Sequence, residues 1–215
     1  MILAIYCAGG LGREIIEFAR SINRWENIIF VDDVTGEKIV SGADVFRFSQ
    51  VEQFRGNLEF IIANGEPAAR ETLYNKVKEA GYPFGTLISP YCSILSKTEI
   101  GEGCILYDCV ISTNVHVGPN VMMNGKVLIG HDTVVGAHSV LSALSFLGGD
   151  TYIGRRVYIA PGAMIKDRIH IGDDAIISLG AVILRNVREE SIMIGNPARK
   201  LGNNMEKTVF HRFYK

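Results

Sequence analysis

His131 and its neighbour Asp132 are the residues of this sequence best suited to acid–base chemistry. An imidazole changes charge near neutral pH and can remove a proton from a hydroxyl or an amine. A carboxylate beside it can orient the ring or favour its protonated form. His131 is therefore a candidate general base, and a solvated surface histidine is the alternative interpretation.

A second candidate site lies near the N-terminus, where Gly9, Gly10 and Gly12 separate an apolar run from a helical pattern. Glycines between a strand and a helix let the backbone approach a phosphate, with the helix N-terminus directed at it. Asp32 follows Gly12 by 20 residues, where dinucleotide-binding folds place a ribose-binding carboxylate. Cys7 occupies the first glycine position of the GxGxxG pattern, so a tight turn without a ligand remains the alternative.

The elements that position this loop alternate between strand and helix over residues 1–85. Strands are expected at residues 1–7, 28–31 and 60–63, and helices at residues 12–23 and 67–80, with Gly81 as a helix C-cap. This order is typical of a small parallel sheet covered by helices. A nicotinamide-dependent reductase needs a larger sheet and a second substrate domain, so we do not expect hydride transfer.

Residues 90–187 follow a different pattern, in which a large apolar residue recurs at every sixth position. The position after this apolar residue is often small, and the fourth position after the same apolar residue is small or β-branched. This period predicts a hexapeptide-repeat parallel β-helix, with three six-residue units in each triangular coil and coils about 4.8 Å apart. We expect the large residue to point inward and glycine to form the corner, whereas a β-sandwich keeps no strict period. The predicted inward residues are Ile105, Ile111, Val117, Met123, Ile129, Val135, Leu141, Leu147, Ile153, Ile159, Ile165, Ile171, Ile177 and Ile183.

The repeat also predicts what lies beside His131. Because three six-residue units make one coil, each residue should stack on the residue 18 positions later. This count places His131 at a corner, with Gly149 at the same corner of the next coil. A backbone N–H beside a general base can stabilise the oxyanion of an acyl-transfer intermediate. The spacing therefore favours an acyl-transfer site made by His131, Asp132 and Gly149.

Composition excludes several other classes. The 215 residues are 47% apolar and 21% charged with a net charge of −1, so the basic surplus of an electrostatic nucleic-acid binder is absent. No stretch approaches the roughly 18 apolar residues of a membrane span, and we expect a cytoplasmic protein. The cysteines form no CxxC pair and are expected to be reduced thiols, with Cys7 in the core; they are Cys7, Cys92, Cys104 and Cys109.

The other histidines give no metal site. His116 and His131 are fifteen residues apart, so they do not stack in an 18-residue coil, and His138 falls at a different corner. We therefore expect no zinc. His138 is expected at a corner or an interface, and His116, His170 and His211 at the surface.

Several segments give the chain a resemblance to a known family over nearly its whole length. They are residues 7–14, 31–33, 123–124, 129–132 and 181–199. Together with the repeat they resemble the left-handed β-helix acyltransferases, and among these the nucleotide-sugar and sialic-acid acetyltransferases of bacterial surface-glycan pathways. The expected organisation is a nucleotide-sugar-binding, Rossmann-like βαβ domain over residues 1–85 and a left-handed parallel β-helix over residues 86–200. Residues 201–215 are expected to cap the open coil, with a helix over residues 203–215.

The resemblance implies a reaction and its ligands. Acetyl-CoA would be the acyl donor and a nucleotide-linked sugar the acceptor, with the sugar, the nucleotide and the choice between nitrogen and oxygen left open. It implies phosphates near residues 9–12, a base or ribose near Asp32 and Asp33, and contact of Asn124 with the substrate beside the acceptor group. The family's Gly-Asn pair is only partly kept, as Gly65-Glu66.

The resemblance also implies an assembly. Coenzyme A would lie in a groove between adjacent subunits of a homotrimer, with Gly149 and Gly180 along the groove and Arg199 near the coenzyme phosphates. His131 would act as the general base, and no metal would take part. A non-catalytic trimeric scaffold that binds sugar nucleotides is the alternative function.

Overall fold

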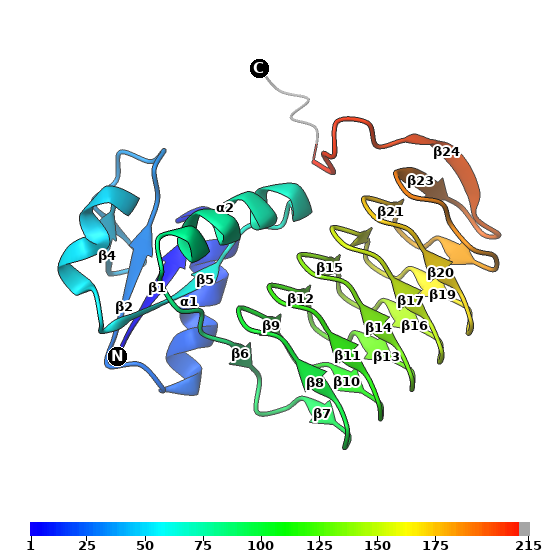
Figure 1. Ribbon diagram of the computed structural model, residues 1–215, viewed down its shortest axis with the longest axis horizontal. Coiled ribbons are helices and arrows are strands. Elements are labelled where there is room, and N and C mark those ends of the chain that lie inside the picture. The colour runs from blue at the N-terminus through cyan, green and yellow to red at the C-terminus, as the bar shows by residue number, and fades with distance from the viewer. Residues whose placement is uncertain (211–215) are drawn as a thin grey trace.

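The computed structural model describes residues 1–210 and divides into an α/β domain and a triangular β-helix that lie side by side (Figure 1). The sheet of the α/β domain has the order β3-β4-β2-β1-β5, in which β3 and β4 pair antiparallel and the other pairs are parallel. Its strands are β1 (Ile2–Tyr6), β2 (Asn27–Val31), β3 (Ile39–Val40), β4 (Ala43–Phe46) and β5 (Leu58–Ile62). Its helices are α1 (Gly10–Ile22), the 3-10 helix η1 (Phe48–Phe54) and α2 (Pro67–Glu79).

The expected βαβ order is confirmed. Helix α1 buries Ile15, Ile16 and Ala19 against the sheet, at the spacing of one helical face. Helix α2 begins with a proline in its first turn and is followed by Gly81 at φ +77°, as the C-cap prediction requires. The sequence reasoning missed β3, β4 and η1, because these elements are short and carry no clear hydrophobic period.

The β-helix consists of two-residue strands that stack in parallel into three sheets, and the longer strands β23 and β24 at its C-terminal end pair antiparallel with each other. We name each sheet after one member: the β12 sheet, the β13 sheet and the β14 sheet. Strands of the β12 sheet are β6 (Leu87–Ile88), β9 (Ile105–Leu106), β12 (Met122–Met123), β15 (Val140–Leu141), β18 (Tyr158–Ile159), β21 (Ile176–Ile177), β23 (Ser191–Ile194) and β24 (Arg199–Asn203). Strands of the β13 sheet are β7 (Ser93–Ile94), β10 (Val110–Ile111), β13 (Leu128–Ile129), β16 (Phe146–Leu147), β19 (Met164–Ile165) and β22 (Val182–Ile183). Strands of the β14 sheet are β8 (Glu99–Ile100), β11 (His116–Val117), β14 (Val134–Val135), β17 (Tyr152–Ile153) and β20 (His170–Ile171).

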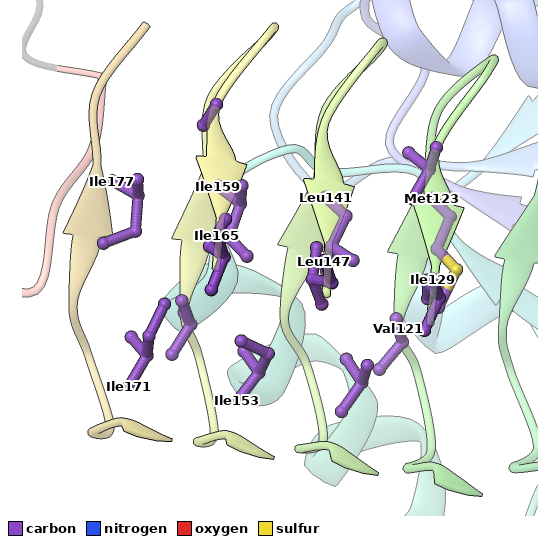
Figure 2. Packing of buried hydrophobic residues seen from close by; sticks show 14 of the residues in the cluster. Val121, Met123, Ile129, Leu141, Leu147, Ile153, Ile159, Ile165, Ile171 and Ile177 are labelled. Carbon is purple, nitrogen blue, oxygen red and sulfur yellow. The ribbon is translucent and has the colours of Figure 1, made fainter. Parts of the chain in front are cut away.

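The apolar core of the prism confirms the six-residue period. Inward side chains from successive coils lie in rows along the prism, as Figure 2 shows for Met123, Leu141 and Ile159 among others. The fourth position after an inward residue is often buried as well, for example at Val121, Thr133 and Ser145. The coil is left-handed, as the resemblance implied.

One part of the predicted phase is wrong. Strand β10 pairs with β7 so that Val110 lies opposite Ser93, a step of 17 residues, whereas Leu128 lies opposite Val110, a step of 18. Because of this short step, the inward residue of β9 lies five residues before Ile111 and not six. It is Leu106, while Ile105 points outward and packs with the α/β domain. Both positions are apolar, so counting by six could not distinguish them.

The expected role of the glycines is also wrong. The corner residue with a positive φ comes two positions after the small residue, and most of these corners are not glycine. The glycine after the inward residue is needed instead because the next coil lies too close: a Cβ on Gly118 would be 2.8 Å from Ala137 N. The corner residues are Lys97, Gly103, Asn114, Asn120, Lys126, Asp132, His138, Leu144, Asp150, Arg156, Gly162, Arg168, Asp174, Gly180 and Glu190.

The α/β domain covers the outer face of the β12 sheet. Ile105, Met122 and Val140 point outward from that sheet into the cluster formed by α1 and β1. Arg70 on α2 is fully buried and donates hydrogen bonds to Ile62 O (2.7 Å), and to Asn120 O and Oδ1 (2.9 and 2.7 Å). The two domains therefore share both an apolar and a polar contact.

His138 belongs to the same contact and lies at a prism corner, as expected. Its Nδ1 is 3.0 Å from Asn120 Nδ2, and its ring packs edge-on against Tyr74 of α2. Burial lowers the pKa of His138 to about 4, although Glu71 opposes this shift. The ring is therefore neutral near pH 7, with Nδ1 as the acceptor of the Asn120 amide.

The C-terminal segment does not form the expected helix within the described residues. Asn203, the last residue of β24, pairs with Ser191 of β23. Asn204 then donates from N to Glu190 O (2.6 Å) and from Nδ2 to Asp174 O (3.0 Å). These bonds hold the backbone on the prism, and a turn at residues 205–206 follows. Residues 211–215, where the rest of that helix and His211 were expected, lie outside the described residues.

We expect Gly118→Ala to destabilise the prism, because the new methyl group would meet the backbone of the next coil. Overpacking of this kind costs about 1–3 kcal/mol. Gly125→Ala is the matched control, since no atom lies within 4 Å of a Cβ at Gly125. Urea unfolding of both variants tests the difference, and equal midpoints would contradict the close-approach explanation.

Protonation of His138 should destabilise the fold in mild acid. Its pKa is about 4 in the native state and about 6.5 in the unfolded chain. The unfolded state therefore binds the extra proton, so the stability present above pH 6.5 is lost as pH falls toward 4, by at most about 1.4 kcal/mol per pH unit. His138→Gln should flatten the measured free energy of unfolding over this range. His170→Gln, at an exposed position, is the control and should keep the wild-type slope.

Candidate active site

His131 lies at the prism edge where the chain passes from the β13 sheet to the β14 sheet. The preceding Ile129 is buried in the core, which fixes the start of the corner and leaves the His131 side chain 62% exposed. Nδ1 of His131 is 2.6 Å from Asp132 Oδ2. Within the described part of the chain the other ring nitrogen, Nε2, makes no hydrogen bond, so the corner presents it for chemistry.

Asp132 is itself held in place by the coil below. Asn114, 18 residues earlier at the same corner, donates from Nδ2 to Asp132 Oδ1 at 2.6 Å. This hydrogen bond, followed by the contact with His131, lowers the pKa of Asp132. The carboxylate is thus ionised and can accept the Nδ1–H of His131, which makes Nε2 the basic nitrogen.

Gly149 lies directly beside the His131 ring, as the 18-residue count predicted. A Cβ at Gly149 would be 2.6 Å from His131 Nε2, so a side chain there would displace the ring from this position. Asp150 N donates to His131 O at 2.8 Å, which fixes the two coils at this edge. Within residues 1–210 the Gly149 amide donates no hydrogen bond, so it is available to a ligand.

Sequence reasoning missed Asn114 as part of this group. The signal was present, because Asn114 precedes Asp132 by one coil and occupies the same corner position. An asparagine at a left-handed corner is commonplace, however, so the spacing alone did not indicate a contact with the carboxylate.

The glycine loop lies at the carboxyl ends of β1, β2 and β5, beside a cleft of about 630 Å³. Gly9 is the N-cap of α1 and has no side chain to cap the helix, so amides of the first turn can meet an anion. Cys7, at the first glycine position of the pattern, has the φ of +84° that glycine usually adopts. Only Gly12 is required by packing, because a Cβ there would meet Cys7 O; Gly9 and Gly10 are open.

Asp32 and Asp33 border this cleft, but both carboxylates already have partners. Asp32 accepts hydrogen bonds from the amides of Ala8, Val34 and Thr35 at 2.8–2.9 Å, and these outweigh partial burial and lower its pKa. Asp33 is 2.5 Å from Tyr6 Oη and 2.7 Å from Lys76 Nζ. These bonds outweigh partial burial in the same way and lower the pKa of Asp33 to about 2. Both side chains therefore shape the cleft.

The remaining predicted site residues are spread over the chain. Asn124 and Gly180 lie at the edge between the β12 and β13 sheets, away from the His131 edge. Arg199 lies on β24, beside a second cleft of about 560 Å³ that Arg185 and Lys200 also line. A single chain thus brings together His131, Asp132 and Gly149, but not Asn124, Gly180 or Arg199.

His116 and His170 lie at the surface, as expected. His116 is exposed, with Nδ1 3.2 Å from Glu99 Oε2, and His170 is exposed and stacks on Tyr152.

Among residues 1–210, no three His, Cys, Asp or Glu side chains gather in a way that could hold a metal ion. In the same part of the chain no helix is both long and apolar enough to cross a membrane.

Two known protein families match parts of this chain. Residues 2–77 match the PglD N-terminal domain, and residues 150–185 match the bacterial transferase hexapeptide, as six repeats. The first match covers the sheet and both α-helices of the α/β domain, and the second covers part of the prism.

Similar proteins share nearly the whole chain. A GDP-perosamine N-acetyltransferase from Escherichia coli O157:H7 is 29% identical over 200 residues, which cover 89% of this chain and 81% of that protein. The acetyltransferase domain of PglB from Neisseria gonorrhoeae FA1090, solved with acetyl coenzyme A, is 25% identical with a TM-score of 0.87, over 93% of this chain and 98% of that one.

A third similar protein was solved with both ligands of an acetyl transfer. PerB from Caulobacter crescentus, in complex with CoA and GDP-perosamine, is 25% identical with a TM-score of 0.86. The match covers 94% of this chain and 98% of PerB. The chain thus combines a match to the PglD N-terminal domain with a match to bacterial transferase hexapeptide repeats, and over nearly its whole length it is similar to acetyltransferases.

Proposed function

We propose that this protein transfers an acetyl group from acetyl-CoA to an amino or hydroxyl group of a nucleotide-linked sugar. The observation that carries the proposal is the set of contacts at one prism edge, where Asn114 holds Asp132, Asp132 holds His131, and His131 faces Gly149. The relatives named as N-acetyltransferases favour an amine as the acceptor. Such a step would serve bacterial surface-glycan synthesis in the cytoplasm, as the resemblance implies.

The proposed mechanism is a direct transfer. Nε2 of His131 removes a proton from the acceptor as its nitrogen or oxygen attacks the thioester carbonyl. Asp132 accepts the Nδ1–H and stabilises the imidazolium that forms. The Gly149 N–H stabilises the oxyanion of the tetrahedral intermediate, which collapses when the CoA thiolate leaves and takes the proton from His131.

The cleft of the α/β domain is the proposed site of the nucleotide. The uncapped start of α1 and the open Gly9 and Gly10 suit a diphosphate. Asp32 and Asp33 shape the cleft wall, and we expect the base or ribose beside them. Because Asp33 is already bonded to Tyr6 and Lys76, its contribution is to hold this wall, with Asp32 nearer the loop.

A homotrimer would complete the site. The α/β domain covers the β12 sheet, whereas His131 lies at the opposite edge, so one chain does not join its own cleft to its own histidine. The outer face of the β13 sheet carries an exposed apolar stripe with one residue from each of four successive coils: Val110, Leu128, Phe146 and Met164. Such a stripe is typical of a surface that a second copy covers. In that assembly Asn124, Gly180 and Arg199 of one subunit could face His131 and Gly149 of another.

His131→Ala should reduce kcat for acetyl transfer by about 10²-fold or more, since removal of a general base costs a factor of this order. The measurement is thiol release from acetyl-CoA in the presence of a panel of nucleotide-linked 3-amino and 4-amino sugars. His116→Ala is the control, because His116 is an exposed histidine on the outer face of the β14 sheet. Near wild-type turnover in His131→Ala would exclude the mechanism. Binding of sugar nucleotides without thiol release by the wild type would favour the scaffold function.

A double substitution of the apolar stripe tests the assembly. Leu128→Asp with Phe146→Asp places two charges on the surface that would be buried between subunits, so we expect the trimer mass to be lost in analytical ultracentrifugation. Ile39→Asp, an exposed apolar position on β3 of the α/β domain, is the control and should sediment as the wild type does. A wild-type protein that sediments as a monomer would contradict the trimer.

A further inference from the structure

Two cysteines touch one another at the first turn of the prism. Cys92 and Cys109 each precede a strand of the β13 sheet, β7 and β10, and their Sγ atoms are 3.3 Å apart. Ser93 N donates to Cys109 O at 2.9 Å and Ser93 pairs with Val110, so the two cysteines are in register on adjacent coils. Parallel neighbours have Cα atoms about 4.8 Å apart, within the 4.4–6.8 Å that a disulfide spans.

The two thiols differ in burial. Cys109 is fully buried in the prism core, whereas Cys92 is half-buried at the end of the prism. In the described residues no coil lies beyond this end, and the inward Ile94 and Ile100 of the first coil are only partly buried. A small solute can therefore approach Cys92 more readily than Cys109.

The surroundings also favour reaction at Cys92. A thiol hydrogen bond from Cys109 lowers the pKa of Cys92 to about 7, and the thiolate is the nucleophilic form of cysteine. The same contact and burial raise the pKa of Cys109. Cys104 differs, because it is fully buried with Sγ 3.2 Å from Gly118 O.

We propose that Cys92 and Cys109 are an oxidation site that hydrogen peroxide converts into a disulfide between the first two coils. The Cys92 thiolate attacks one peroxide oxygen, the O–O bond breaks, and the released hydroxide takes the proton that Cys92 gave up, which yields one water and Cys92 sulfenic acid. Cys109 sulfur then attacks Cys92 sulfur, and the S–O bond breaks. The departing hydroxide takes the Cys109 proton as the second water, so two thiols and one peroxide give one disulfide and two waters.

The short distance between the two sulfurs favours the second step, in which the disulfide forms. The sulfurs need to approach from 3.3 Å to about 2.0 Å, without a change of strand register. The bond would close a loop over residues 92–109 and join coils that otherwise meet through backbone hydrogen bonds. We therefore expect the oxidised prism to resist unfolding better than the reduced one.

The experiment compares the reduced full chain before and after hydrogen peroxide, with free thiols then blocked by iodoacetamide. Peptide mass spectrometry should find Cys92 joined to Cys109 and lighter by two hydrogens, with Cys7 and Cys104 alkylated after unfolding. The thermal midpoint should rise on oxidation and return after treatment with dithiothreitol. Cys104→Ser should keep both results.

Cys92→Ser should abolish the linked peptide and the rise in midpoint, and Cys92→Ala serves if that variant folds poorly. Cys109 remaining alkylatable while Cys92 proceeds to sulfinic acid would overturn the proposal. So would a linkage that includes Cys7 or Cys104, or two unreacted thiols at peroxide concentrations that oxidise exposed methionines of the same chain.

Discussion

The buried guanidinium of Arg70 holds the two domains of this protein together. Within residues 1–210 it has no carboxylate partner and instead donates to carbonyl and amide oxygens of Ile62, Asn64 and Asn120. Burial lowers its pKa to about 10, so it keeps its charge near neutrality. A planar group with several fixed donors suits this task, because it can satisfy oxygens from two domains at once. Removal of any one acceptor would leave a buried charge underbonded.

The position of both candidate sites depends on this contact. Asn64 follows β5 and lines the cleft, while Asn120 is a corner of the prism, so the Arg70 side chain links the cleft to the coils. The α/β domain is thereby placed over the β12 sheet, and the His131 edge is left exposed on the other side. The separation of cleft and histidine within one chain is thus a consequence of how the domains are joined.

The sequence predicted the prism well because each coil repeats one packing problem. The inward position of each six-residue unit must be apolar, and at two of the three prism edges glycine often follows it because the next coil lies close. The pairing of His131 with Gly149 followed from the count alone. The 17-residue step between the first two coils could not be predicted from the count, because Ile105 and Leu106 are both apolar. The partners of Asp32 and Asp33 were also hidden, since they depend on backbone amides and on Tyr6 and Lys76 from distant segments.

The step between the first two coils is 17 residues, one residue fewer than the usual 18, and this short step shows where the chain tolerates a change of length. It lies between Leu106 and Ile111, before the coils that carry the histidine, so the pairings from β10–β13 to β19–β22 keep an 18-residue step. The same deletion between residues 131 and 149 would set Asp150 in place of Gly149 and drive a side chain into the imidazole. The start of the prism therefore accommodates a coil that is one residue short, whereas the same deletion between His131 and Gly149 would break the contact on which the proposed site depends.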